Sequence, residues 1–118
     1  MADGMDWDEI VTFALNLPGV TLRRAAKGRM VPMVRGRQIV APGGAPGTIA
    51  LRAAREEIEY LREAEPDIFF QTPQYEGWPV VLVHADRADP EHLKALIERA
   101  WWDRASGKQR AERGGARP

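Results

Sequence analysis

Six basic side chains in the first third of the chain have the types and spacing to bind phosphate groups. Arg and Lys donors position proteins on nucleic-acid phosphates, and a β-hairpin can carry such donors into a groove. A tight hairpin turn is predicted at Arg35-Gly36-Arg37, because glycine accepts the backbone conformation that such turns need. The candidate phosphate-binding residues are Arg23, Arg24, Lys27, Arg29, Arg35 and Arg37. The alternative is a solvated surface that pairs with helical acids, for which Glu56, Glu57, Glu59 and Glu63 are available.

The distribution of charge along the chain bears directly on that choice. The chain has 17 Lys and Arg residues and 17 Asp and Glu residues, so its formal net charge is zero. This balance argues against a protein that binds any polyanion through uniform positive charge. However, residues 10–55 contain eight basic residues and no acid, whereas residues 56–103 contain twelve acids and four bases. The phosphate hypothesis depends on whether these two blocks face each other.

A second candidate site is the loop at residues 72–79, which contains two aromatic side chains between prolines. Tyr75 and Trp78 could stack on a flat ligand, and Thr72 and Gln74 could donate or accept hydrogen bonds. The competing interpretation is structural, with the prolines holding the loop while its aromatic rings cover the edge of the core. This loop is the predicted location of a small-ligand or protein-interaction site, if the chain has one.

Other site chemistries find little support. The chain has no cysteine, and its one serine is Ser106, so a Ser or Cys nucleophile with a His base is not expected. A strand-end His and a first-turn His could share a metal ion with nearby carboxylates, but helix capping and solvation explain these residues more simply. These candidate metal ligands are His84, Asp86, Asp89 and His92. We therefore predict no catalytic set, no metal site and no cofactor.

The elements that would position these residues follow from hydrophobic periodicity and turn signals. Helices are predicted at 7–15, with Asp6 and Glu9 as a capping box, at about 53–64, and from Asp89-Pro90 to about residue 104. Strands are predicted at 21–25, 29–35, 38–41, 48–52, 68–70 and 80–83. The clustering of strands predicts an α+β fold in which helices pack on one face of a single antiparallel sheet. Residues 1–104 would form one domain, and residues 105–118 a basic, flexible tail.

The expected setting of the chain follows from its length and hydropathy. With 118 residues it is long enough for one packed domain. No apolar run approaches the roughly 20 residues of a membrane span, so we expect a cytoplasmic protein without a membrane partner. Trp102 lies one position off the apolar face of the last helix, where it could contact a second copy of the chain or another partner, or pack partly buried against a neighbouring loop.

Two stretches resemble the MmcQ/YjbR-like family. Residues 7–20 are similar to the opening of that family, and residues 69–83, with their Thr-Pro-x-Tyr-x-Gly-Trp-Pro pattern, look like its most specific signature. The resemblance covers residues 5–103. It implies a compact domain similar to the frataxin-like sandwich, with DNA binding through a double-wing arrangement of hairpins and no catalytic residues. Gln74 and Val80 stand where the family often has a His and an aromatic residue, so roles that depend on those side chains do not carry over.

From the residues and the resemblance together we predict a non-catalytic DNA-binding protein that contacts phosphates through basic hairpins. A module that binds a small ligand or a protein through the loop at 72–79 is the alternative.

Overall fold

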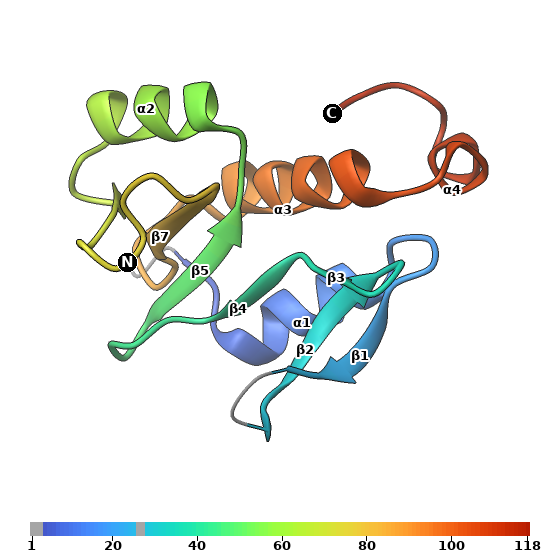
Figure 1. The fold of residues 1–118 in the computed structure, drawn as a ribbon, viewed down its shortest axis with the longest axis horizontal. Helices are drawn as coiled ribbons and strands as arrows, with labels where there is room; N and C mark the ends of the chain where they lie inside the picture. Colours follow the sequence, from blue (N-terminus) through green and yellow to red (C-terminus); the bar gives the residue numbers. More distant parts are fainter. Residues whose placement is uncertain (1–3, 26–27) are drawn as a thin grey trace.

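The computed structural model describes residues 4–25 and 28–118, which form helices and antiparallel β-sheets (Figure 1). Lys27, one of the candidate phosphate ligands, lies outside the described residues. In chain order the elements are α1 (Trp7–Leu15), β1 (Thr21–Arg24), β2 (Met30–Val34), β3 (Arg37–Gln38), β4 (Val40–Pro42), β5 (Thr48–Arg52), α2 (Arg55–Ala64), β6 (Phe69–Phe70), β7 (Val80–His84), α3 (Pro90–Arg104) and α4 (Gly107–Glu112).

The strands form two sheets, so the prediction of a single sheet is wrong although the α+β class is confirmed. One sheet has the order β1-β2-β3 and the other the order β4-β5-β7-β6, and neighbouring strands are antiparallel in both. The strand predicted at 38–41 is divided at Ile39, where the chain passes from the first sheet to the second.

Pro32 explains where the division falls. In register, Pro32 of β2 lies opposite Ile39, and the Ile39 N–H donates to the Pro32 carbonyl over 3.2 Å. Proline has no N–H that could donate to the Ile39 carbonyl in turn, so the hydrogen-bonded ladder between β2 and β3 ends there. The Ile39 carbonyl instead accepts from the Arg52 N–H over 3.2 Å, which begins the pairing of the chain with β5.

The predicted tight turn at the end of β2 is confirmed. Arg35 and Gly36 have φ angles of 53° and 74°, and they connect the paired residues Val34 and Arg37. Two consecutive residues with positive φ are typical of a type I′ turn, whose twist matches that of the strands it joins. The turn therefore fixes the register of β3 and projects Arg35 from its tip.

The four-stranded sheet has buried residues on both of its faces. Ile49, Leu51, Val81 and Val83 belong to the main core, to which α1, α2 and α3 all contribute buried residues. The opposite face carries a smaller buried cluster of Ala50, Val80 and Leu82, against which Phe70 and Tyr75 pack. Helices thus cover one face of this sheet, as predicted, and the loop after β6 covers part of the other.

Helix boundaries agree closely with the capping signals in the sequence. The Asp6 side chain accepts from the Glu9 N–H at 2.9 Å, and the Glu9 side chain accepts from the Asp6 N–H at 3.1 Å. At the start of α3, Asp89 accepts from the His92 N–H, and Pro90 is the first helical residue. Across the two described ranges, no helix is both long and apolar enough to cross a membrane.

We expect Asp6→Ala to lower the free energy of unfolding by about 1 kcal/mol, because the Glu9 N–H loses the side chain that accepts from it and the capping box is broken. In thermal unfolding this corresponds to a decrease in Tm of about 4 °C. Asp8→Ala is the matched control, since Asp8 is also an exposed acid of the first turn but has no capping side chain. Equal effects of the two substitutions would contradict a specific role for the cap.

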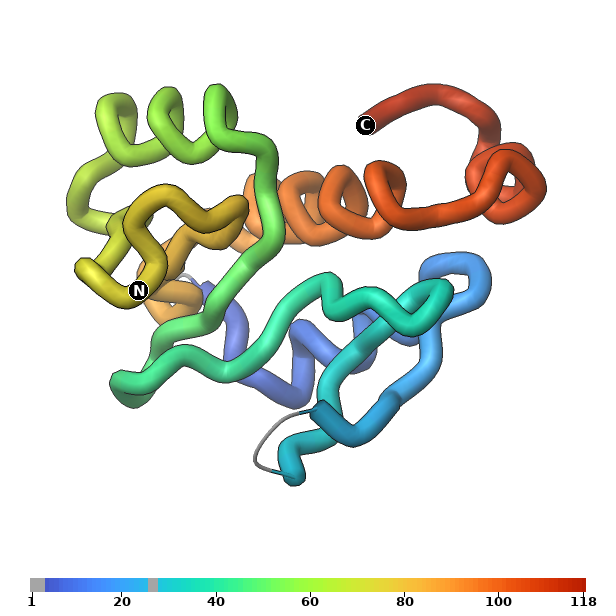
Figure 2. Tube along the Cα trace, in the orientation of Figure 1, coloured from blue at the N-terminus to red at the C-terminus, as the bar shows by residue number. Residues whose placement is uncertain are grey.

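The C-terminal segment, residues 105–118, is the part predicted to be a basic, flexible tail. It contains helix α4, with Ser106 as its N-cap and Gln109 completing a second capping box. The Ser-x-x-Gln spacing was the local signal for this helix, and the absence of an apolar stripe obscured it. After α4 the chain doubles back along α3 toward α2 (Figure 2).

Candidate nucleic-acid interface

Arg23 and Arg24 lie on β1, an edge strand of the three-stranded sheet, and both are exposed. Successive strand residues point to opposite faces, so one arginine lies on each face. Arg24 shares its face with Leu22, two residues earlier, and with Met30, its cross-strand partner. These two apolar residues are 37% and 47% exposed, respectively. This face therefore presents basic and apolar groups together.

The remaining described arginines of the predicted set lie near the two ends of β2, and all are exposed. Arg29 precedes β2 and donates from Nη1 to the Pro42 carbonyl over 3.2 Å. Arg35 lies in the turn, and Arg37 begins β3. We call the five exposed arginines of this sheet and its turns the basic hairpin surface: Arg23, Arg24, Arg29, Arg35 and Arg37.

The acids that could have neutralised this surface are engaged elsewhere or form no ion pair with it. Glu57 of α2 pairs with Arg99 of α3, and Glu65 lies 3.6 Å from His92 Nδ1. Within residues 4–25 and 28–118, none of the ion pairs includes an arginine of the basic hairpin surface. The pairing with helical acids that the alternative interpretation requires is therefore not observed for the described arginines.

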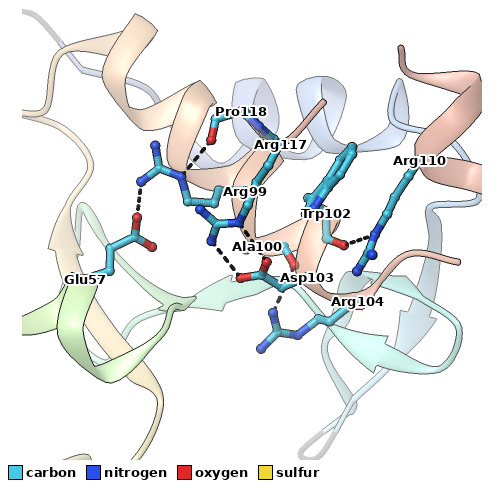
Figure 3. A network of polar contacts seen from close by, with 9 residues as sticks. All are labelled: Glu57, Arg99, Ala100, Trp102, Asp103, Arg104, Arg110, Arg117 and Pro118. Atoms are coloured by element: carbon cyan, nitrogen blue, oxygen red, sulfur yellow. Dashed lines mark hydrogen bonds and ion pairs between the residues drawn. The ribbon is translucent and has the colours of Figure 1, made fainter. Parts of the chain in front are cut away.

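Basic residues of the C-terminal segment pair with acids of α3, and Figure 3 shows one of these pairs, between Arg117 and Asp103. The Arg113 guanidinium donates to both carboxylate oxygens of Glu98, at 3.2 and 2.9 Å, and this hydrogen bonding raises the pKa of Arg113. Arg117 donates to both oxygens of Asp103, each over 3.3 Å. The acidic block of the sequence is thus offset partly by α3 itself and by the tail.

Arginines from three elements line a surface cavity of about 610 Å³ next to the hairpin turn. Arg37 comes from β3, Arg52 from the end of β5 and Arg104 from the last turn of α3, and Asp103 also lines the cavity. Arg37 was predicted to bind phosphate, but Arg52 and Arg104 were not. No local motif marks them, because residues 52 and 104 meet only through the packing of α3 on the sheets.

Burial lowers the pKa of Arg104, and the nearby positive charges of Arg52 and Arg37 lower it further, while Asp103 opposes the shift. Burial is the largest cause, and the positive charges of Arg52 and Arg37 act on Arg104 in the same direction. An arginine keeps its charge despite such a shift, so the cavity is electropositive.

The loop at 72–79 does not gather its four candidate residues around one cavity. Tyr75 packs on the outer face of the sheet, and the Thr72 carbonyl accepts from the Tyr75 and Glu76 N–H groups. Trp78 is 62% exposed and lines a cavity of about 170 Å³, to which Thr72, Gln74 and Tyr75 do not contribute. Cavities that bind drug-sized ligands usually hold about 300–1,000 Å³, so a ligand role for this loop stays a prediction.

The His and Asp residues considered as metal ligands have other contacts. The His84 ring stacks on Phe70 with centroids 4.7 Å apart, and His92 lies near Phe69 and Glu65. In the part of the chain that the structure describes, no three His, Asp or Glu side chains gather as metal ligands would.

Trp102, considered as a contact for a second copy of the chain, is half-buried and has a partner within its own chain. The Arg110 guanidinium of α4 lies 5.1 Å from the centre of the indole ring, and Arg110 Nε donates to the Trp102 carbonyl over 2.8 Å. The tail therefore covers part of the surface that a second copy would need.

Comparison with known proteins places the chain in a family. Uncharacterized proteins of Mycobacterium bovis and of two strains of Mycobacterium tuberculosis are each 33% identical to it over 54 residues, which are 45% of this chain and 42% of the relative. The match thus spans less than half the length of these curated relatives. No solved structure matches the chain significantly. A model of the YjbR family matches residues 15–102, which include all seven strands and most of α3. The resemblance noted in the sequence is confirmed, and the chain belongs to the YjbR family.

Proposed function

We propose that this protein is a non-catalytic DNA-binding protein that contacts backbone phosphates through the basic hairpin surface. The observation that carries the proposal is the lack of ion pairing at this surface among the described residues. An arginine without a carboxylate partner keeps its donors available for phosphate, whereas a paired arginine must first give up its partner.

The arrangement of charge in space supports the same function. The acidic helix α2 and the hairpin of β1 and β2 lie on opposite sides of the molecule (Figure 1). Among the described acids, Glu57, Glu98 and Asp103 pair with arginines of α3 and the tail. The arginines of the basic hairpin surface therefore have no ion-pair partner among the described residues, although the net charge of the whole chain is zero.

The face of β1 and β2 that carries Arg24 also presents exposed apolar side chains. Leu22 and Met30 are exposed beside Arg24, and apolar side chains contact thymine methyl groups or wedge between base steps in many DNA complexes. The β4–β5 hairpin is the second candidate wing, but its loop at 43–47 carries no charged side chain. We assign the phosphate contacts to the first hairpin for this reason.

A salt titration of duplex DNA binding tests the proposal. Each neutralised phosphate contributes about −0.9 to the slope of log affinity against log salt, so five arginine contacts predict a slope of about −4.5. Raising NaCl from 50 to 200 mM should then weaken binding about 500-fold, measured by fluorescence anisotropy of a labelled duplex.

The control ligand is a peptide nucleic acid duplex of the same sequence, which presents the same bases without phosphates. Loss of binding to this control is the expected result. The proposal fails if DNA does not bind at low salt, if the slope is near zero, or if the uncharged duplex binds equally well.

A further inference from the structure

The cavity beside the hairpin turn is built by residues that are distant in the sequence. The sheet switch at Ile39 brings Arg52 next to β3, because the Arg52 N–H donates to the Ile39 carbonyl. The last turn of α3 adds Arg104 from the other side. Three arginines therefore line a single cavity of about 610 Å³, within the usual range for a small-ligand site.

Most donors of these guanidinium groups are unused by the protein. Arg104 donates from Nη1 to the Ala100 carbonyl over 2.9 Å (Figure 3). Among the hydrogen bonds of the described residues, none involves the side chain of Arg37 or Arg52. Each guanidinium carries five N–H donors, so the cavity offers many charged donors to an anion.

One carboxylate, that of Asp103, lines the cavity, and it forms an ion pair with Arg117 of the C-terminal segment. Both oxygens of Asp103 accept from Arg117, each over 3.3 Å. Arg117 therefore competes with the cavity arginines for this carboxylate. Because Arg117 offsets the charge of Asp103, the three cavity arginines leave an excess of positive charge, which suits an anionic ligand group.

We propose that Arg37, Arg52 and Arg104 form a binding site for the phosphate group of a phosphate monoester. A monoester phosphate carries close to two negative charges above neutral pH. It also has three terminal oxygens, which can accept hydrogen bonds from the planar guanidinium groups of several arginines. A free phosphate monoester and the 5′-phosphate end of a DNA strand share this chemistry. The site does not depend on the basic hairpin surface as a whole, since only Arg37 belongs to both.

Isothermal titration with inorganic phosphate at pH 8 and constant ionic strength tests the site. Arg52→Gln and Arg104→Gln should each weaken phosphate binding at least about tenfold, because each removes a charged donor group. Arg87→Gln is the matched control, since Arg87 is exposed in the turn after β7 and does not line the cavity. Asp103→Asn should instead tighten binding, because it removes the negative charge that opposes the ligand.

Opposite effects at residues 52 and 103 would not arise from a merely structural role. The proposal is overturned if wild-type protein shows no saturable binding up to about 10 mM phosphate. It is also overturned if binding persists unchanged in Arg52→Gln. Circular dichroism verifies that each variant folds, and Arg52→Gln decides the matter if Arg104→Gln does not fold.

Further titrations identify the source of the phosphate and separate this site from DNA binding. Adenosine 5′-monophosphate represents the free monoester, and an oligonucleotide with a 5′-phosphate is compared with its 5′-hydroxyl form. Tighter binding of the phosphorylated oligonucleotide, lost in Arg52→Gln, supports the proposal with a DNA end as the ligand. Equal binding of both oligonucleotides, together with saturable binding of the mononucleotide, supports it with a free monoester.

Failure of this site and failure of the proposed function give different results. The double variant Arg23→Gln/Arg24→Gln should lose duplex affinity and keep phosphate affinity, because neither residue lines the cavity. If phosphate binds and duplex DNA does not, the proposed function alone fails. If duplex DNA binds and phosphate does not, the cavity site alone fails.

Discussion

Trp101→Ala is expected to lower the free energy of unfolding by about 3–5 kcal/mol, a large share of the total for a domain of this size. The Trp101 side chain is 0% exposed and belongs to the main core. Its Nε1 donates to the Pro18 carbonyl over 2.8 Å, which joins α3 to the connection between α1 and β1. The substitution therefore creates a cavity and leaves a carbonyl group without its donor.

Urea unfolding followed by circular dichroism measures the effect. Trp101→Phe separates its two causes, since it keeps most of the ring volume and removes the hydrogen bond, for an expected loss of about 1–3 kcal/mol. Trp102→Ala is the control, because Trp102 is only half-buried on the same helix. A loss below about 1 kcal/mol for Trp101→Ala would contradict its place in the core.

Charge reversal of Arg23 and Arg24 to Glu is expected to weaken duplex DNA binding about 100-fold at low salt. Each lost contact between a charged donor and phosphate is worth about 1.5 kcal/mol or more, and 1.4 kcal/mol corresponds to a factor of ten. The salt slope should also become shallower by about 1.8, because two phosphates are no longer neutralised. Stability should change by no more than about 0.5 kcal/mol, since both side chains are exposed.

The matched control reverses two arginines on other parts of the surface, Arg62 and Arg87, to Glu. Both are exposed, and neither belongs to the basic hairpin surface. The control changes the net charge of the chain by the same amount, so it should weaken binding far less if the location of the charge matters. Equal losses in the two double variants would indicate attraction by net charge alone and would count against a defined interface.

Local signals in the sequence predicted the helices and turns well. The capping box of Asp6 and Glu9, the start of α3 at Asp89-Pro90 and the turn at Arg35-Gly36 each involve residues within four positions of one another. Such signals act through backbone geometry and short-range hydrogen bonds, so they need no tertiary context. The capping box of α4 belongs to the same class, but no apolar stripe accompanies it, so the sequence pattern there does not indicate a helix.

The division into two sheets could not be predicted from strand patterns alone. The residues at 37–42 suit an extended conformation throughout, and only the pairing of Ile39 with Pro32 on one side and Arg52 on the other divides them. Which carbonyl accepts from which N–H depends on the register of strands that are distant in the sequence. That information appears only when the strands are assembled.

By itself, the sequence determined the types and order of most elements, the family, and the basic block at residues 23–37, because these depend on composition and short-range pattern. The tertiary structure decided how charge is paired. The acids of α2 and α3 meet arginines of α3 and the tail, and Arg37, Arg52 and Arg104 meet around one cavity. Coulombic interactions depend on distance in space, and in a folded chain residues 52 positions apart can line the same site.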